Sequence, residues 1–253
     1  MIRFVLALAL VGAWAAPGLA DVMVLKEGSA LVTVIILDPL FVGVTAGNIV
    51  NVDVADTGFH SNPNSNNQAG TAVIIDENYP DNLFKFDLST LDDLAGATIN
   101  KAQLALYHTA GNSGNNIGTV LYHDWSEVAN RTSPTGSITV KGWGPLSDSK
   151  FGAADYVITS TMAQSSFETN ALFGTGTCKW LVGDVTASLQ AMIDGSASNF
   201  GWYVYDSIRK LVATENVNDA YRPALYIDYT PVPEPATIGL LVLGGLAMIH
   251  RRR

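Results

Sequence analysis

The sequence has little cysteine and little positive charge. Its 253 residues include one Cys, 14 Lys and Arg, and 23 Asp and Glu, which gives a formal net charge of −9. A single Cys excludes a disulfide framework and a cysteine-based zinc site. The acidic balance argues against a nucleic-acid partner, because such a protein needs a basic face to meet phosphates. The apolar content of 48% excludes a disordered chain.

Familiar catalytic patterns are also missing. The chain has no Gly-x-Ser-x-Gly elbow, no His-Glu-x-x-His pair and no phosphate-binding glycine loop. Cys178 stands alone and is interpreted as a buried apolar residue rather than a nucleophile. His108 and His123 flank one loop, where a surface metal site and two cross-strand or solvated histidines are alternatives. We therefore predict a protein that is not an enzyme.

Carboxylate pairs leave one catalytic alternative open. Asp92 with Asp93, or Asp53 with Asp56, could serve glycoside chemistry if the two carboxyl groups lay at a suitable distance. The sequence does not set that distance, and 23 acidic residues produce chance pairs. A polysaccharide-degrading enzyme is accordingly the least favoured hypothesis.

Apolar runs long enough to span a bilayer are absent as well, and the two longest lie at the ends of the chain. The first, residues 4–16, follows Arg3 and precedes small residues at Gly18 and Ala20. This order is typical of a secretory signal peptide. We predict a signal peptide over residues 1–20, cleaved by signal peptidase after Ala20, with a buried N-terminal strand or helix as the alternative.

The C-terminal run, residues 236–249, is also short. As a helix its roughly 14 residues would measure about 21 Å, less than the ~30 Å hydrocarbon core. Pro233-Glu234-Pro235 precedes the run, and Arg251-Arg252-Arg253 follows it. Arginines in that place favour the cytoplasmic side of a membrane. A simple tail anchor is one interpretation of these features.

The combination of Pro-Glu-Pro, a short apolar helix and a basic end resembles the PEP-CTERM sorting tail. The resemblance covers about the last 22 residues, and we assign residues 231–253 to this tail. It implies an exosortase as partner, which would remove the tail near the motif. It also implies transient anchoring in the inner membrane through the C-terminal helix, and a final place at the cell surface or in the extracellular matrix.

Between the two ends the chain reads as short strands with polar turns. In residues 83–89 Phe84, Phe86 and Leu88 alternate with polar residues, and a similar pattern predicts strands near 98–108, 137–141, 155–160, 200–206 and 224–229. Residues 61–70 and 111–118 are rich in Asn, Gly and Ser and are predicted loops. Residues 184–193 have helical spacing, with Asp184 or Thr186 to begin the helix and Gly195 to end it.

These patterns predict an all-β, jelly-roll-like antiparallel β-sandwich with one short helix, in addition to the signal peptide and the apolar sorting helix. Residues 48–230 are the expected sandwich domain. Residues 21–47 are an N-terminal strand extension, in which residues 31–37 and 40–44 form a strand pair at the edge of the core.

The central region resembles the DNRLRE domain, a module of secreted bacterial proteins that is akin to one family of carbohydrate-binding modules. Six segments carry the resemblance, in this order: Asp56 to Gly70, Asp81 to Ser89, Gly96 to Tyr107, Trp125-Ser126-Glu127, Asp184 to Gly201, and Glu215 to Tyr229. The chain departs from the family pattern at Leu83, which stands in place of the Arg, and at Met192, where Trp is common. The resemblance implies a jelly-roll-like fold and association with carbohydrate.

Sugars stack on aromatic rings, so exposed aromatic residues are candidate glycan contacts. Trp143 lies among Gly and Pro and is the Trp most expected at the surface, whereas Trp125, Trp180 and Trp202 are expected in the core. Tyr203 and Tyr205 share one strand face, which is either an outward stacking platform or a covered part of the core.

Cofactors are not expected, apart from a structural calcium ion. The acidic oxygen donors that loops could gather for calcium are Asp53, Asp56, Asp76, Asp206 and Asp228. No EF-hand spacing is present, so the sequence assigns no ligands.

The leading hypothesis is a non-catalytic surface or matrix protein whose sandwich domain associates with extracellular polysaccharide. The alternative is a structural envelope spacer that binds no glycan. Processing at both ends would remove Arg3 and the three C-terminal arginines and leave a more acidic protein. Neutral glycans, or acidic glycans bridged by calcium, are therefore the expected ligands, unless Arg209 and Lys210 form a local basic patch.

Overall fold

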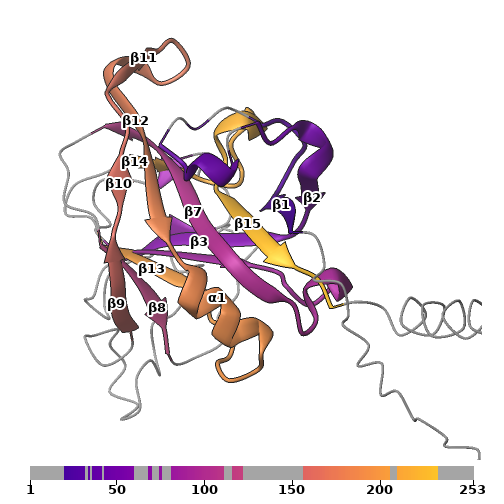
Figure 1. Ribbon diagram of the computed structural model, residues 1–253. Helices are drawn as coiled ribbons and strands as arrows, with labels where there is room; N and C mark the ends of the chain where they lie inside the picture. Colours follow the sequence, from indigo (N-terminus) through magenta and orange to yellow (C-terminus); the bar gives the residue numbers. More distant parts are fainter. Residues whose placement is uncertain are drawn as a thin grey trace, which may run out of the picture.

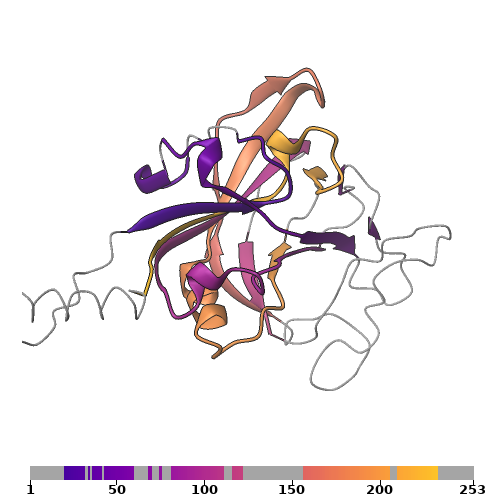
Figure 2. The same cartoon turned by 90° about the vertical axis from the view of Figure 1, so that its right-hand side faces the viewer.

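The computed structural model describes residues 20–31, 34, 36–41, 43–59, 68–69, 74–75, 81–110, 116–121, 156–205 and 210–232. Over these residues the protein forms two β-sheets and one α-helix, α1 (Thr186–Ile193), which lies at one end of the sandwich (Figures 1 and 2). The predicted all-β sandwich with one short helix is confirmed. The proposed signal peptide and the residues after Val232 lie outside the described part.

The larger sheet contains nine strands. Six of them follow the order β10 (Ala163–Gln164), β12 (Gly174–Asp184), β7 (Thr98–Ala110), β15 (Ala224–Thr230), β1 (Asp21–Lys26) and β2 (Ile49–Asn51). In addition, β11 (Glu168–Asn170) pairs with β12, β14 (Lys210–Val212) pairs with β7, and β5 (Ile74–Ile75) pairs with β14. Among the described strands the β1–β2 pair is parallel and all other pairs are antiparallel, so the sheet departs from the purely antiparallel prediction at this pair.

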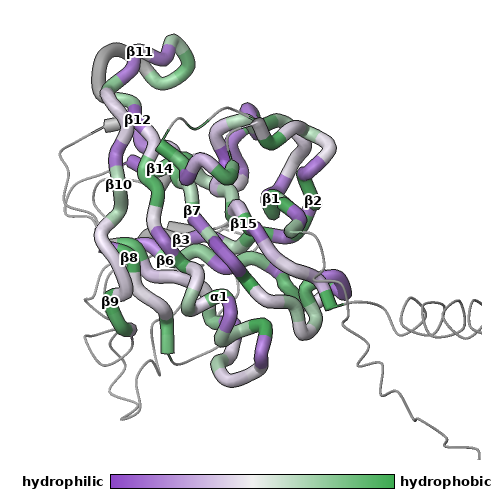
Figure 3. The backbone as a smooth tube through the Cα atoms, in the orientation of Figure 1, coloured by the Kyte–Doolittle hydropathy of each residue, from purple (hydrophilic) through white to green (hydrophobic). Residues whose placement is uncertain are grey.

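The smaller sheet contains six strands, in the order β4 (Gln68–Ala69), β3 (Val54–Phe59), β6 (Asp81–Phe86), β13 (Trp202–Tyr205), β8 (Asn116–Val120) and β9 (Tyr156–Thr161). Four short 3-10 helices connect elements: η1 (Pro39–Phe41), η2 (Ala46–Asn48), η3 (Asp92–Leu94) and η4 (Asp219–Tyr221). Along the strands of both sheets hydrophobic and hydrophilic residues follow each other in short stretches (Figure 3).

The main core fills the space between the two sheets. Phe84 and Phe86 of β6, predicted to point inward, are fully buried, as are Leu104 and Leu106 of β7. Trp202 of β13 is fully buried with them, as the sequence predicts. Burial of large apolar side chains from both sheets is the main force that holds such a sandwich together.

Helix α1 closes one end of this core. Val185, Leu189 and Met192 are buried in it, which confirms the predicted helical face. The Oδ1 atom of Asp184 accepts a hydrogen bond from the backbone N–H of Thr186 at 2.9 Å, just before the first turn. Gly195 follows the helix with φ +71°, a left-handed conformation in which glycine carries little strain.

A buried hydrogen bond ties α1 to the smaller sheet. The indole Nε1–H of Trp202 donates to Oγ of Ser188 at 2.8 Å, and Ser188 is 8% exposed. We expect Ser188→Ala to lower the free energy of unfolding by about 1–3 kcal/mol, because the indole N–H then has no acceptor. The matched control is Ser196→Ala in the exposed turn after α1, which should change it by less than about 0.5 kcal/mol. Urea denaturation measures both, and equal losses would contradict the assignment.

A second apolar layer covers the outer face of the larger sheet. Ala105 and Tyr107 of β7 lie on this face with Trp180 of β12 and Tyr226 of β15. Val34, Leu37 and Phe41, which precede β2, are buried against them, and the ring centroids of Phe41 and Tyr226 are 5.7 Å apart. Strand β7 is thus buried on both faces.

The predicted strand pair in residues 31–37 and 40–44 is wrong. The described residues of this segment form turns and η1, and none of them lies in a strand. Leu37 N–H donates to the carbonyl of Val34, and Asp38 N–H donates to the side chain of Gln103 in β7. Val34, Ile36 and Leu37 pack their side chains onto the sheet without forming a strand, so tertiary packing overrides strand propensity.

The beginning of the N-terminal segment is an inner part of the sheet rather than an edge element. β1 pairs with β15 over six positions, from Asp21↔Tyr229 to Lys26↔Ala224, and β2 pairs with its other side. The Lys26 side chain, 1% exposed, donates to the carbonyl oxygens of Ala30 and Asp219, each at 2.6 Å. These contacts fix the start of the described chain to the region just before β15.

The two predicted loops are partly strand. Gln68–Ala69 is β4, and Asn116–Gly118 begins β8, which pairs with β13 and β9. A methyl group on Gly118 would lie 2.7 Å from the carbonyl oxygen of Val157. Glycine in β8 therefore permits a close approach to β9 rather than marking a turn.

Candidate functional site

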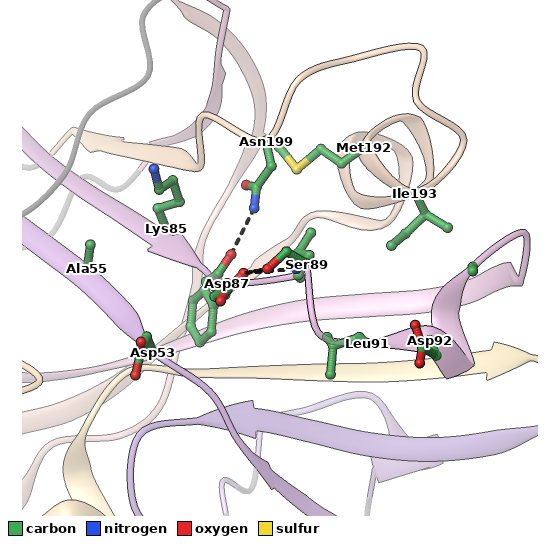
Figure 4. A pocket seen from close by; sticks show the side chains of 13 residues that line it. Asp53, Ala55, Lys85, Asp87, Ser89, Leu91, Asp92, Met192, Ile193 and Asn199 are labelled. Atoms are coloured by element: carbon green, nitrogen blue, oxygen red, sulfur yellow. Dashed lines mark hydrogen bonds between the residues drawn. The ribbon is translucent and has the colours of Figure 1, made fainter.

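A pocket of about 650 Å³ opens beside helix α1, where the ends of four segments meet. The wall has an apolar part and a polar part (Figure 4). The apolar part consists of Ala55, Phe86, Leu88, Leu91, Ala95, Met192 and Ile193, and the polar part of Asp53, Lys85, Asp87, Ser89, Asp92 and Asn199. These residues come from the start of β3, the end of β6 with the turn after it, η3, and the end of α1 with the loop after it.

Local hydrogen bonds hold two polar groups of the wall in place. Asp87 Oδ1 accepts from the backbone N–H of Ser89 at 2.8 Å and from its hydroxyl at 2.6 Å. The hydrogen bonds from Ser89 lower the pKa of Asp87 below its usual value, so this carboxylate is ionised at neutral pH. Asn199 Nδ2 donates to the carbonyl of Phe86 at 2.8 Å, which fixes its amide across the end of β6.

The pocket has more negative than positive charge. Three carboxyl groups, Asp53, Asp87 and Asp92, line it together with one amine, Lys85. The backbone N–H of Asp87 donates to the carbonyl of Asp53 at 2.9 Å, which ties the first two together across β3 and β6. An anionic ligand would therefore meet repulsion here, whereas a neutral polyhydroxylated ligand would find charged hydrogen-bond acceptors and one donor.

Of the predicted glycan contacts, only the side chain of Tyr203 is among the described residues, and it does not line this pocket. Trp143 and the side chain of Tyr205 lie outside the described residues. Tyr203 is 2% exposed, and its ring packs in a tilted arrangement against Tyr156 with centroids 4.2 Å apart. This part of the strand face is covered, so Tyr203 belongs to the core. Its prediction as an exposed glycan contact is wrong. The predicted burial of Trp180 and Trp202 is confirmed, at 5% and 0% exposure.

The carboxylates considered for calcium are dispersed. Asp53 lines the pocket, Asp56 is 3% exposed in β3, and Asp228 is 5% exposed in β15 of the other sheet. Asp76 and Asp206 lie outside the described residues. Within the described part of the chain, no group of three or more His, Cys, Asp or Glu side chains could hold a metal ion.

The side chains considered for catalysis fall into three environments. Asp92 lines the pocket while its neighbour Asp93 does not. His108 is fully buried in β7, and His123 lies outside the described residues. Cys178 is 1% exposed, and burial raises the pKa of its thiol. The predicted burial of Cys178 is confirmed, and a thiol with a raised pKa is a poor nucleophile.

The sequence did not single out Lys85, Asp87, Ser89 or Asn199 as site residues. Asp87 and Ser89 have the pattern of the solvent side of a strand, and Asn199 is one residue of the segment Asp184 to Gly201 that resembles the DNRLRE domain. A usable signal was the Asp-Leu-Ser turn directly after a buried strand, because polar residues at strand ends often line sites.

Comparison with known proteins identifies one end of the chain. Residues 231–253 match the PEP-CTERM protein-sorting motif. This match confirms the predicted sorting tail and implies export, processing by an exosortase, and a cell-surface or extracellular destination. No curated protein matches the chain. Among the described helices, none is both long and apolar enough to cross a membrane.

Proposed function

We propose that this protein is a non-catalytic surface or extracellular-matrix component that binds a neutral polysaccharide through the pocket beside α1. The observation that carries the proposal is the composition of that pocket, in a protein whose sorting motif directs it outside the cell. Apolar side chains on one part of the wall suit the ring faces of a sugar. Fixed carboxylate, amide and amine groups on the other part suit its hydroxyls.

The pKa of Asp87 argues against this residue as the general acid of a glycoside hydrolase. A glycoside hydrolase needs one carboxyl group with a raised pKa to act as a general acid. The pKa of Asp87 is lowered instead, because Ser89 donates two hydrogen bonds to it. An acidic polysaccharide would need a bridging cation such as calcium to approach three carboxylates.

The proposal also includes the type of sandwich and the processing of the two ends of the chain. The sandwich is jelly-roll-like and of the DNRLRE type, signal peptidase cleaves after Ala20, and the C-terminal helix anchors the precursor transiently in the inner membrane. The support is the sequence resemblance described above, together with the match to the sorting motif at residues 231–253.

The test compares two adjacent aspartates. Exported protein should bind a neutral polysaccharide in a panel of neutral and acidic glycans, assayed with and without calcium. Asp92→Ala should weaken binding by about ten- to a hundredfold, because a charged hydrogen bond contributes about 1.5–3 kcal/mol. Asp93→Ala removes the same charge outside the pocket and should change the affinity less than about twofold.

Absence of binding to every glycan would support the structural spacer instead. Equal effects of the two aspartate variants would place the site elsewhere, and Trp143→Ala then tests the other candidate contact. Release of reducing ends or unsaturated sugars by the wild-type protein would contradict the non-catalytic assignment.

A further inference from the structure

The sorting motif begins almost directly after a strand that is locked into the domain. β15 pairs with β1 on one side and with β7 on the other, and its register reaches Thr230, which lies opposite Thr98. Residues Ala224 to Tyr229 are all buried. The last residues of β15 therefore cannot be drawn out of the sheet without opening the core.

Few residues separate this strand from the motif. Pro233, the first residue of Pro-Glu-Pro, is three positions after Thr230. A fully extended chain gains at most about 3.6 Å per residue, so these three steps span at most about 11 Å. That reach is about the diameter of one α-helix with its side chains, roughly 10–12 Å. An enzyme that binds Pro233-Glu234-Pro235 therefore lies in contact with the folded domain.

The part of the domain that lies at this exit is defined by several contacts. Tyr229 pairs with Asp21, and its pKa is raised by burial and by the nearby charges of Asp21 and Asp93. A methyl group on Gly96 would lie 3.4 Å from Cγ2 of Val232. In Figure 1 the end of β15 lies beside the turn that contains η3. We call this surface, formed by the exposed residues Asp21, Asp93, Gly96 and Val232 around the buried Tyr229, the exit face.

We propose that the exit face docks directly on the exosortase while the tail is being processed, so that the enzyme acts on a folded domain and not on a free peptide. The exosortase is the expected partner because the matched sorting motif starts within the reach of the exit face. It does not depend on glycan binding, so either proposal can fail alone.

The opposite end of the larger sheet provides a control position. β7 runs from Thr98 at the exit face to Ala110, thirteen residues in all, which corresponds to about 40 Å at 3.3 Å per residue. Leu172, in the turn between β11 and β12, lies beyond that far end and is 63% exposed. A probe there would not reach an enzyme bound at the exit face.

The experiment is site-specific photocrosslinking in cells that produce a tagged exosortase. The full chain carries a photoreactive amino acid at Asp93 or at Thr98, both exposed, or at Leu172. Asp93 and Thr98 should each crosslink to the tagged exosortase at least about five times more than Leu172 does. A second chain carries twelve Gly and Ser residues between Thr230 and Pro231, which adds an r.m.s. distance of about 19 Å while residues 231–253 stay intact.

In the chain with the insertion, crosslinking from Asp93 and Thr98 should fall to the level of Leu172, although the tail is still cleaved. Crosslinking that stays equal with and without the insertion would overturn the proposal. Equal crosslinking from all three positions, or none from Asp93 and Thr98 in a chain that is cleaved, would also overturn it.

Discussion

Gly201→Ala should lower the free energy of unfolding by about 3–5 kcal/mol, one of the largest effects available from a single methyl group in this protein. Gly201 has φ +80°, and a Cβ there would overlap the carbonyl oxygen of Phe84 and lie 2.9 Å from Cβ of Lys85. The Phe84 oxygen belongs to the backbone of β6, a strand paired on both sides, so it cannot move away cheaply. Relief of the clash requires separation of β13 from β6.

The control for this variant is Gly195→Ala. Gly195 also has a positive φ, +71°, but nothing lies within 4 Å of the position of its missing Cβ. Gly195→Ala should lower the free energy of unfolding by only about 1 kcal/mol, the penalty for alanine in a left-handed conformation. Urea denaturation of both variants measures the difference. If Gly201→Ala loses no more stability than Gly195→Ala, the close contact between Gly201 and β6 is not present in solution.

Between about pH 4 and pH 8 the stability of the wild-type protein should fall as the pH rises, because of Asp56. Its carboxyl group is 3% exposed, and burial together with the charge of Glu215 raises its pKa from 3.8 to about 8. In the unfolded chain the group loses its proton near pH 4, whereas in the folded protein it keeps the proton until about pH 8. In this window the folded state therefore binds one proton more than the unfolded state, and the free energy of unfolding falls by roughly 1.4 kcal/mol for each pH unit.

The neutral substitution Asp56→Asn should remove this pH dependence. The backbone N–H of Thr214 donates to Oδ2 of Asp56 at 2.6 Å, and an asparagine oxygen can accept the same hydrogen bond. The variant should match the wild type at pH 4 and exceed its stability at pH 9 by about 5–6 kcal/mol, because the pKa of Asp56 is raised from 3.8 to about 8 and each pH unit contributes roughly 1.4 kcal/mol.

Denaturation curves at pH 4, 6 and 9 measure this effect. Asp93→Asn, on an exposed residue, is the control and should leave the pH dependence unchanged. A wild-type stability that stays level from pH 5 to pH 8 would show that water reaches the Asp56 carboxylate.

Sequence patterns predicted the elements whose regularly spaced apolar side chains bury one face in the core. Phe84 and Phe86 of β6 are fully buried as their alternation requires, and α1 buries Leu189 as its spacing requires. The segment before β2 was not predictable, because Val34 and Phe41 pack onto Tyr107 and Tyr226, which are remote in sequence. A run of β-branched residues looks the same in the sequence whether it forms a strand of a sheet or packs on the face of that sheet.

The pocket was harder to predict than the fold. Asp53, Asp87 and Asn199 come together only because β3 pairs with β6 and because the loop after α1 crosses the end of β6. Each residue alone looks like a polar residue of a strand end or a turn. Tyr203 illustrates the converse case: its strand face was identified, but its burial depends on Tyr156, a residue of another part of the chain.

The position of β15 has a consequence for the order of events during folding. β15 is the last strand of the described chain, yet it lies between β7 and β1 in the middle of the larger sheet. Until residues 224–230 are available, β1 has no antiparallel partner and β7 lacks one of its neighbours. Joining Asp21 to Tyr229 closes a loop that contains nearly the whole domain, and such non-local pairing is slow. The larger sheet can therefore be completed only after residues 224–230, which directly precede the sorting tail, have become available for pairing.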